Sequence, residues 1–266
     1  MLKMNFSMNH SFHLVTSSPW PLLGSLILFN LMIGFINYVV SMNLKLFIFS
    51  FLILQLILFQ WWRDVIREGL FLGDHTILVN KGLRLGMFLF IISEVMFFFS
   101  FFWMYFHMFL SPSVDIGNLW PPKMIYTFNP MGLPLLNTLL LLCSGYSISM
   151  SHFGLLKNNF YMFKLGLFKT ILLGLIFLCI QFKEYNECSF TISDSVFGSS
   201  FFLLTGFHGL HVVIGVLFLM INYMRLNLYH FSALNHKGFE FASWYWHFVD
   251  VVWLFVYLIV YWLIYF

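Results

Sequence analysis

The sequence predicts an all-α membrane protein with seven transmembrane helices. Of its 266 residues, 61% are hydrophobic and only 9% are charged, and the mean hydropathy is +0.89. A soluble domain of this length needs far more charge to cover its surface. Apolar segments also reach or approach the roughly 20 residues that a helix needs to cross a bilayer. A β-barrel would show alternating segments of about ten residues instead, and none occurs in the sequence, so the spans are predicted to be helices.

The predicted spans cover residues 20–40, 44–62, 85–110, 133–156, 165–182, 196–224 and 241–266. The fifth span contains Lys169, whose ammonium group can reach the interface when the helix end lies there. The longest connection on the more basic side is a polar loop, 63–84. It separates an arm of two helices, residues 1–62, from a bundle of five helices, residues 85–266.

The distribution of basic residues predicts the orientation in the membrane. One side, formed by the N-terminus and the connections after the second, fourth and sixth spans, carries ten of the thirteen Lys and Arg residues. The other side carries Lys45, Lys123 and Lys183. By the positive-inside rule, the N-terminus faces the cytoplasm-equivalent side, which is the matrix in a mitochondrion. An odd number of spans then places the C-terminus on the opposite side.

Composition also limits the partners and the chemistry. The net charge of +3 comes from scattered basic residues without a basic run, so we expect no nucleic-acid partner. Cys143, Cys179 and Cys188 are widely separated and odd in number, which predicts neither a disulfide framework nor a cysteine metal site. The first residues lack the pattern of a signal peptide, so the first span is expected to be retained.

Glu94 is the most unusual side chain in the predicted spans. It lies within an otherwise uncharged apolar run, LGMFLFIISEVMFFFSFFWMYFHMFL at 85–110. A carboxylate at that depth costs several kcal/mol unless it is protonated, paired or turned towards a polar interior. We therefore expect Glu94 to be protonated and hydrogen-bonded.

Four further ionisable side chains share a layer of the membrane with Glu94. At a rise of about 1.5 Å per residue, Glu94 and Asp250 each lie roughly 14 Å from the more basic side, and His247 lies roughly 9 Å from it. His208 and His211 come out at middle depth in the sixth span. Residues three apart lie on one helix face, so His208 can act with His211, and His247 can pair with Asp250. The five residues are predicted to form a buried polar network.

Small residues beside the histidine pair predict how the helices pack. These residues are Gly206, Gly209 and Gly215. Glycines allow another helix to approach closely in a membrane. We predict that the sixth span packs against the third, and that one of the two histidines forms a hydrogen bond with Glu94.

Three functions fit these polar residues. Two histidines on one helix can ligate a metal or a haem, but haem in a bundle normally takes axial ligands from facing helices, and no second strong His pair is present. A proton relay or ion pathway through Glu94 fits the residue types. A structural network that fixes helix packing fits them equally well. No nucleophile constellation, phosphate-binding loop or dinucleotide fingerprint accompanies them, so neither a catalytic residue nor a metal site is predicted.

Long motifs in the chain resemble one membrane protein family. They are WWRDVIREG at 61–69, FIISEVMFF at 90–98, FTISDSVFGSSFF at 190–202, TGFHGLHVVIG at 205–215 and FASWYWHFVDVVWLF at 241–255. Together they closely resemble subunit III of the mitochondrial haem–copper cytochrome c oxidase. The resemblance extends from about residue 19 to the C-terminus.

The resemblance implies both a fold and a function. It implies one subunit III domain over residues 1–266, with helices 1–2 and helices 3–7 forming two arms around a lipid-filled cleft. It also implies a non-catalytic core subunit of respiratory complex IV, which transfers electrons from cytochrome c to oxygen and pumps protons. Such a subunit would stabilise the core, bind phospholipid, and aid proton uptake and oxygen access. The implied location is the mitochondrial inner membrane, with the N-terminus in the matrix and the C-terminus in the intermembrane space.

Roles for single residues follow from the same resemblance. Glu94 matches a buried carboxylate that reacts with a carbodiimide, and His211 lies close to it in the family. A set of positions near phospholipid headgroups is also implied: Trp62, Arg67, Glu68, His75, Arg225 and His230. The implied lipids are phospholipids such as cardiolipin or phosphatidylglycerol. No cofactor is implied in this chain, because haem a and copper belong to partner subunits. The implied partners are subunit I chiefly, subunit II and the supernumerary subunits.

A stand-alone seven-helix proton or ion channel that uses Glu94 is the alternative function. The two functions differ in what purifies with the chain. Haem absorption bands and larger co-eluting subunits indicate the oxidase, whereas a colourless, isolated oligomer indicates the channel.

Overall fold

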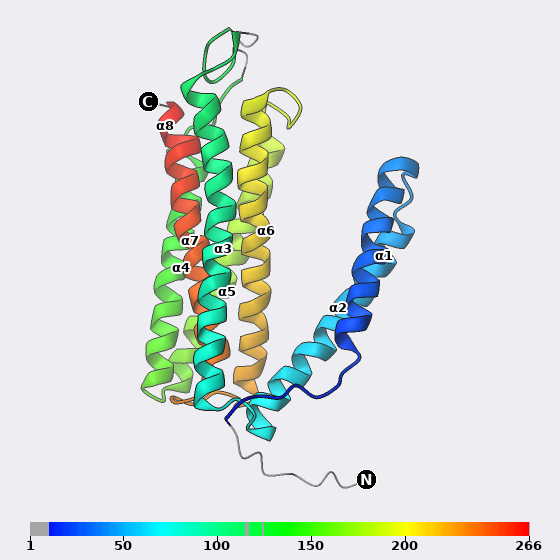
Figure 1. Cartoon of the computed structure of the whole chain (residues 1–266). Helices are drawn as coiled ribbons and strands as arrows, with labels where there is room; N and C mark the ends of the chain where they lie inside the picture. The colour runs from blue at the N-terminus through cyan, green and yellow to red at the C-terminus, as the bar shows by residue number, and fades with distance from the viewer. Residues whose placement is uncertain (1–10, 115–116, 124, 266) are drawn as a thin grey trace. The chain divides into compact units, whose positions relative to one another are not determined.

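The computed structural model describes residues 11–114, 117–123 and 125–265, which are helical or lie in connections without a strand. Within these residues, seven helices are long and apolar enough to cross a membrane, which confirms the predicted fold class. The chain divides into two compact units, Met1–Leu85 and Gly86–Phe266. The helices of both units are labelled in Figure 1.

The first unit is built on a helical hairpin. Helix α1 covers Trp20–Ser41 and helix α2 covers Lys45–Arg67. Met42 ends α1 in the left-handed conformation, with its N–H bonded to the carbonyl of Tyr38. Near this turn the backbones approach closely, because a Cβ at Gly34 would lie 2.8 Å from the backbone of Phe47. The two apolar helices therefore pack along each other.

The polar loop predicted at 63–84 is mostly helical, so that prediction is wrong. Helix α2 continues to Arg67, a π-helical turn, η1, covers Glu68–Leu72, and helix α3 begins at Ile77. Only four residues, 73–76, connect the two helices. Hydropathy marks where the membrane ends, whereas a helix satisfies its own backbone hydrogen bonds on both sides of that point. The charged residues at 63–84 thus lie in helical turns near the ends of α2 and α3, except Asp74, which lies in the connection.

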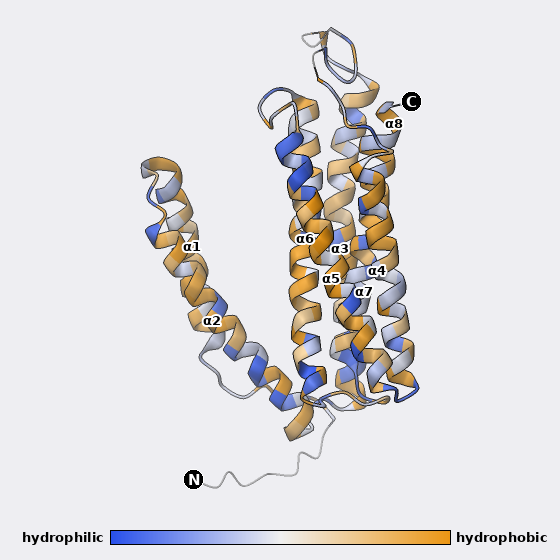
Figure 2. Cartoon of the chain, turned by 180° about the vertical axis from the view of Figure 1, so that it is seen from behind, coloured by the Kyte–Doolittle hydropathy of each residue, from blue (hydrophilic) through white to orange (hydrophobic). Residues whose placement is uncertain are grey.

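The second unit contains a bundle of five long helices. They are α3 from Gly86 onward (Ile77–Leu110), α4 (Leu133–Leu156), α5 (Phe160–Glu187), α6 (Val196–Asn227) and α7 (Lys237–Val256). A π-helical segment, η3 (Tyr257–Trp262), and a short helix, α8 (Leu263–Tyr265), continue α7. Successive long helices run in opposite directions (Figure 1). Hydrophobic residues cover most of their length, as Figure 2 shows.

Small residues bring α4 and α5 together. Ser147 and Thr170 share a hydrogen bond of 2.7 Å between their hydroxyl oxygens, and the Ser151 hydroxyl donates to the carbonyl of Phe163 at 2.9 Å. A Cβ at Gly166 would lie 2.9 Å from the carbonyl oxygen of Ser147. Close packing of small residues and hydrogen bonds between hydroxyls replace the hydrophobic driving force that is missing between helices in lipid.

Trp246 of α7 joins four helices in the core. It is 0% exposed, and its indole N–H donates to the Ser144 hydroxyl of α4 at 2.9 Å. Cβ atoms added at Gly174 of α5 and at Gly215 of α6 would lie 2.7 Å and 2.9 Å from its ring. The two glycines therefore form a slot for this indole.

None of the three glycines predicted to bring α6 close to α3 has α3 as its neighbour, and a Cβ at Gly206 would lie 3.7 Å from the Tyr185 hydroxyl of α5. Gly215 faces Trp246, whereas a Cβ at Gly209 would meet nothing within 4 Å. Helix α3 packs on α6 through long side chains, including Phe97 and Phe101 against Phe207 at ring distances of 5.1 and 5.3 Å. The predicted contact between these two helices is confirmed, but large aromatic side chains make it.

Candidate functional site

Glu94 of α3 and His211 of α6 form a polar contact inside unit 2. Oε2 of Glu94 lies 2.8 Å from Nε2 of His211. The side chain of Glu94 is 24% exposed and that of His211 is 9% exposed. The structure therefore confirms the hydrogen bond that was predicted from the matching depth of the two groups.

The hydrogen bonds of His211 define how many protons this pair holds. Nδ1 of His211 lies 2.7 Å from the carbonyl oxygen of Phe207. A carbonyl oxygen only accepts, so Nδ1 carries a proton. One further proton then lies between Nε2 and Glu94, either on the carboxyl group or on an imidazolium. Both arrangements have zero net charge, which lowers the cost of placing the pair in the membrane.

Aromatic rings surround the His211 imidazole. Phe98 lies 5.0 Å from it in an edge-on arrangement, Phe248 lies at 6.2 Å, and Tyr245 stacks at 6.3 Å. These contacts fix the orientation of the ring and limit the access of water to it. The carboxyl side of the pair is the more exposed side.

His208 lies in a different environment from Glu94, although it shares the helix with His211. It is 1% exposed, and its Nε2 lies 3.2 Å from the carbonyl oxygen of Val249, to which it donates. Phe177 and Trp253 pack against its ring at 5.6 and 5.1 Å. His208 thus connects α6 with α7 inside the bundle.

His247 and Asp250 lie together between α7 and α4. Nε2 of His247 is 3.5 Å from the hydroxyl of Ser149, which is the partner that the described residues provide for it. Oδ2 of Asp250 would lie 2.8 Å from a Cβ at Gly145. The five residues therefore do not form one network. Glu94 lies with His211 between α3 and α6, and His208 contacts the backbone of α7. His247 and Asp250 lie beside α4.

The candidate headgroup residues of unit 1 gather around the end of α2. Nε2 of His13 lies 3.4 Å from Oε2 of Glu68, and the rings of His13 and His75 meet edge-on at 6.0 Å. Trp62 is 53% exposed. The sequence did not predict His13 as a partner of Glu68. The place of His13 in a polar N-terminal stretch gave no signal for this contact.

Asp64 anchors the same end of the hairpin. Its Oδ2 accepts from the indole N–H of Trp20 at 2.8 Å, and its Oδ1 lies 2.9 Å from Nη2 of Arg63. Nη1 of Arg67 is 3.9 Å from the same Oδ1, and the Arg67 side chain is 60% exposed. Arg67 therefore keeps most of its charge uncompensated at the surface of this unit.

Arg225 and His230 lie at the connection between α6 and α7. The guanidinium of Arg225 stacks over the ring of Phe231 at 4.6 Å. The backbone N–H of His230 donates to the backbone carbonyl of Arg225 at 3.1 Å. Burial, with a smaller contribution from the Arg225 charge, lowers the pKa of His230. An anion placed beside both groups would relieve this repulsion.

Side chains that can ligate metals are scattered over the described ranges. No cluster of three or more His, Cys, Asp or Glu side chains there is arranged to hold a metal ion. The three cysteines have free thiols. Burial raises the pKa of Cys188, which keeps its thiol protonated and a poor ligand.

Known proteins match almost the whole chain in sequence. The family model of cytochrome c oxidase subunit III matches residues 10–265. Cytochrome c oxidase subunit 3 of Drosophila melanogaster is 50% identical over 259 residues, which are 97% of this chain and 99% of that protein. The proteins of the same name from Anopheles gambiae and Canis lupus are each 51% identical, over 97% and 95% of this chain and 99% and 97% of their own lengths.

The chain belongs to the cytochrome c oxidase subunit III family. It is therefore a subunit of the cytochrome c oxidase complex, without a catalytic centre of its own, and a multi-pass membrane protein. This membership decides against the stand-alone channel.

This subunit III chain also contains a buried acidic group that the sequence did not reveal. Glu184 of α5 is 0% exposed, and its Oε1 accepts from the Tyr261 hydroxyl of η3 at 2.6 Å. Nearby on α5, Gln181 accepts from the Asn137 amide at 3.3 Å. Glu184 stands in the charged stretch KEYNE at 183–187, directly after the predicted fifth span, 165–182. Its spacing of three from Gln181 could have placed both groups on one inward face.

Proposed function

We propose that this chain serves the oxidase by binding phospholipid, supporting proton uptake and easing oxygen access, while it stabilises the core of the complex. In this proposal it lies in the mitochondrial inner membrane, with the N-terminus in the matrix and the C-terminus in the intermembrane space. The excess of basic residues on one side supports the orientation. Its partners are subunit I chiefly, subunit II and supernumerary subunits, and the first two hold haem a and copper.

Arg225 carries the proposal of phospholipid binding. Its guanidinium packs on Phe231, and it takes part in none of the ion pairs formed within the described residues. A partly buried cation without a carboxylate is costly, whereas a lipid phosphate offers it paired hydrogen bonds. His230 adds a second donor beside it. A phosphate of a lipid such as cardiolipin or phosphatidylglycerol fits this pair.

Arg67 supports a second headgroup site in unit 1. Asp64 already accepts from Trp20 and Arg63 at shorter distances, so its carboxylate compensates little of the Arg67 charge. The exposed indole of Trp62 is suited to the interface where headgroups lie. Glu68 and His75 have protein neighbours in His13. They serve the site by holding the end of α2 in place.

Lipid analysis of the purified oxidase tests both headgroup sites. Arg225→Gln and Arg67→Gln should each lower the amount of tightly bound anionic phospholipid, as counted by mass spectrometry after a detergent wash. Arg63→Gln is the matched control, because Arg63 is already paired with Asp64 at 2.9 Å. Equal lipid content in all variants and the native oxidase would refute the proposal.

The Glu94–His211 pair supports the proposed role in proton uptake. It holds one exchangeable proton between two groups of different elements, and its carboxyl side is the exposed side. A proton can therefore shift between the two groups, or be taken up as another is released, without leaving a net charge on the pair. In the purely structural alternative the same bond only holds α3 on α6.

Turnover of the Glu94→Gln oxidase separates these two roles. Gln keeps a hydrogen-bond donor for His211 but cannot exchange a carboxyl proton. If the pair supports uptake, the variant loses rapid proton uptake while the subunit stays bound with native stability. Native uptake rates in Glu94→Gln leave only the structural role.

Exposed aromatic residues of α3 support the proposed role in oxygen access. Phe88, Phe99 and Trp103 are 54%, 56% and 68% exposed. Oxygen partitions into hydrocarbon, and an apolar aromatic surface with lipid tails on it offers such a phase. Replacing Phe99 with Asn should raise the oxygen concentration needed for half-maximal turnover, whereas the same change at Leu136 of α4, which is 45% exposed, should not.

A further inference from the structure

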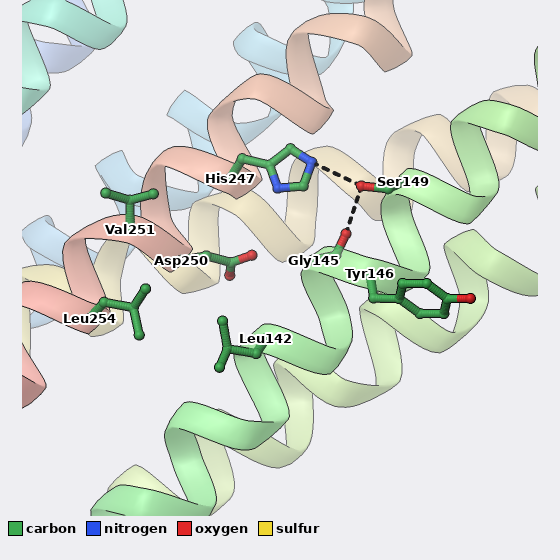
Figure 3. Close-up of a pocket in the computed structure, with 8 residues that line it drawn as sticks. All are labelled: Leu142, Gly145, Tyr146, Ser149, His247, Asp250, Val251 and Leu254. Atoms are coloured by element: carbon green, nitrogen blue, oxygen red, sulfur yellow. Dashed lines mark hydrogen bonds between the residues drawn. The ribbon is translucent and has the colours of Figure 1, made fainter.

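A groove on the outside of the bundle contains a carboxyl group that lacks a partner. The groove has a volume of about 380 Å³ and lies between α4 and α7 (Figure 3). Its walls are mostly apolar, with Leu142 on one side and Val251 on the other. Asp250 points into it from α7, beside His247. Such a group on a membrane-facing surface requires a physical explanation.

The chain itself does not satisfy Asp250. The residue is only 7% exposed, and its Oδ1 has no hydrogen-bond partner among the described residues. Oδ2 is packed against the backbone at Gly145, where a Cβ would lie 2.8 Å away. The nearest polar neighbours, His247 and Ser149, are bonded to each other. A buried carboxyl oxygen left unpaired is destabilising, because it has lost its hydrogen bonds to water without replacement.

The depth of Asp250 restricts what can satisfy it. It lies thirteen residues after Lys237, hence about 20 Å along α7 from the helix start. The predicted span begins later, at residue 241, nine residues before Asp250, so Asp250 lies roughly 14 Å deep, near the middle of a hydrocarbon layer of about 30 Å. Phospholipid phosphates cannot reach that depth, and lipid tails offer no donor. A side chain on another membrane-spanning helix can supply one.

We propose that the groove between α4 and α7 is a docking surface for a transmembrane helix of another oxidase subunit. That helix places a hydroxyl, amide, indole or imidazole donor against Oδ1 of Asp250. Apolar side chains around the donor fill the groove between Leu142 and Val251. Membership of a multi-subunit complex makes such a helix available, and the missing donor specifies its chemistry.

Groove-blocking variants of the purified oxidase test this surface. Val251→Trp places a large side chain in the groove, whereas Val213→Trp makes the same change on α6; the two valines are 50% and 43% exposed. After a detergent wash, the ratio of this chain to the other subunits should fall at least about tenfold for Val251→Trp and stay native for Val213→Trp. Equal retention of the two variants overturns the proposal.

Two further measurements keep the test independent of folding. Asp250→Asn retains an acceptor for the donor and should keep native retention, whereas Asp250→Leu should not. A photo-crosslinking residue, p-benzoylphenylalanine, at position 251 leaves Asp250 intact. It should form an adduct with a membrane-spanning segment of another oxidase subunit that carries a donor. Adducts with lipid alone, or with a second copy of this chain, would refute the assignment.

Discussion

Replacing Gly215 with Ala is expected to loosen the bundle, whereas replacing Gly209 with Ala is not. Both glycines lie on α6, six residues apart, so the gain in helix propensity of about 1 kcal/mol applies to each. They differ in what an added methyl group would meet. At Gly209 it meets nothing within 4 Å, and at Gly215 it meets the indole of Trp246.

The distances give the size of the effect. The added carbon at Gly215 would lie 2.9 Å and 3.1 Å from two ring carbons of Trp246, whereas ordinary carbon contacts are about 3.5–4.0 Å. The ring has no room to move away, because the backbone at Gly174 packs against it and its N–H is hydrogen-bonded to the Ser144 hydroxyl. Overpacking of this kind costs about 1–3 kcal/mol. That range corresponds to a change of about 5- to 150-fold in an opening equilibrium.

Hydrogen–deuterium exchange of the purified oxidase measures this equilibrium directly. Peptides of α7 around Trp246 should exchange about 5- to 150-fold faster in Gly215→Ala than in Gly209→Ala, because local opening sets the exchange rate. The peptides of unit 1 serve as an internal control and should not change. If both variants exchange alike, the indole is not held in a slot between glycines.

Three other perturbations follow from the contacts of single side chains. Glu94→Gln should leave the detergent stability of the subunit nearly native, whereas Glu94→Leu should lower it by about 1–3 kcal/mol, because His211 then loses its buried hydrogen-bond partner; equal losses would contradict a stabilising role of this bond. Tyr261→Phe should destabilise the subunit by about 1–3 kcal/mol, measured by thermal release from the oxidase, since Glu184 loses its hydroxyl donor at 2.6 Å. The lowered pKa of His230 makes the folded state bind a proton less readily than the unfolded state, so stability should fall as the pH drops below about 6.5. A pH series of denaturation midpoints checks this, and His230→Gln should flatten that part of the profile.

Hydropathy predicted the number of membrane-spanning helices but not where they end. The fifth span was placed at 165–182, and the helix covers Phe160–Glu187. Lys164 and Lys183 lie inside it. A long ammonium side chain can leave the membrane while its backbone stays helical. Charge therefore marks the interface, and the helix continues beyond it.

Depth predicted the Glu94–His211 bond but could not assign the other polar residues. Rise per residue gives the position along a helix, whereas the direction around the helix depends on its rotation against its neighbours. Lipid-facing helices are apolar on all sides, so no polar face reveals that rotation. His208 thus came out at the right depth, and it faces α7 instead of α3. Resemblance to a family supplied the function, which no constellation in the chain could have specified.

The bonds made by α7 and η3 have a consequence for biogenesis. The Trp246 indole donates a hydrogen bond to α4, and the Val249 carbonyl accepts one from His208 of α6. The Tyr261 hydroxyl donates one to Glu184 of α5. Trp246, Val249 and Tyr261 belong to a segment that leaves the ribosome after α4, α5 and α6. Until it inserts, the slot between Gly174 and Gly215 lacks its indole, and His208 and Glu184 lack the hydrogen bonds that α7 and η3 provide. An assembly factor that recognises unfinished subunits would therefore find these groups accessible, and the arrival of α7 would conceal them.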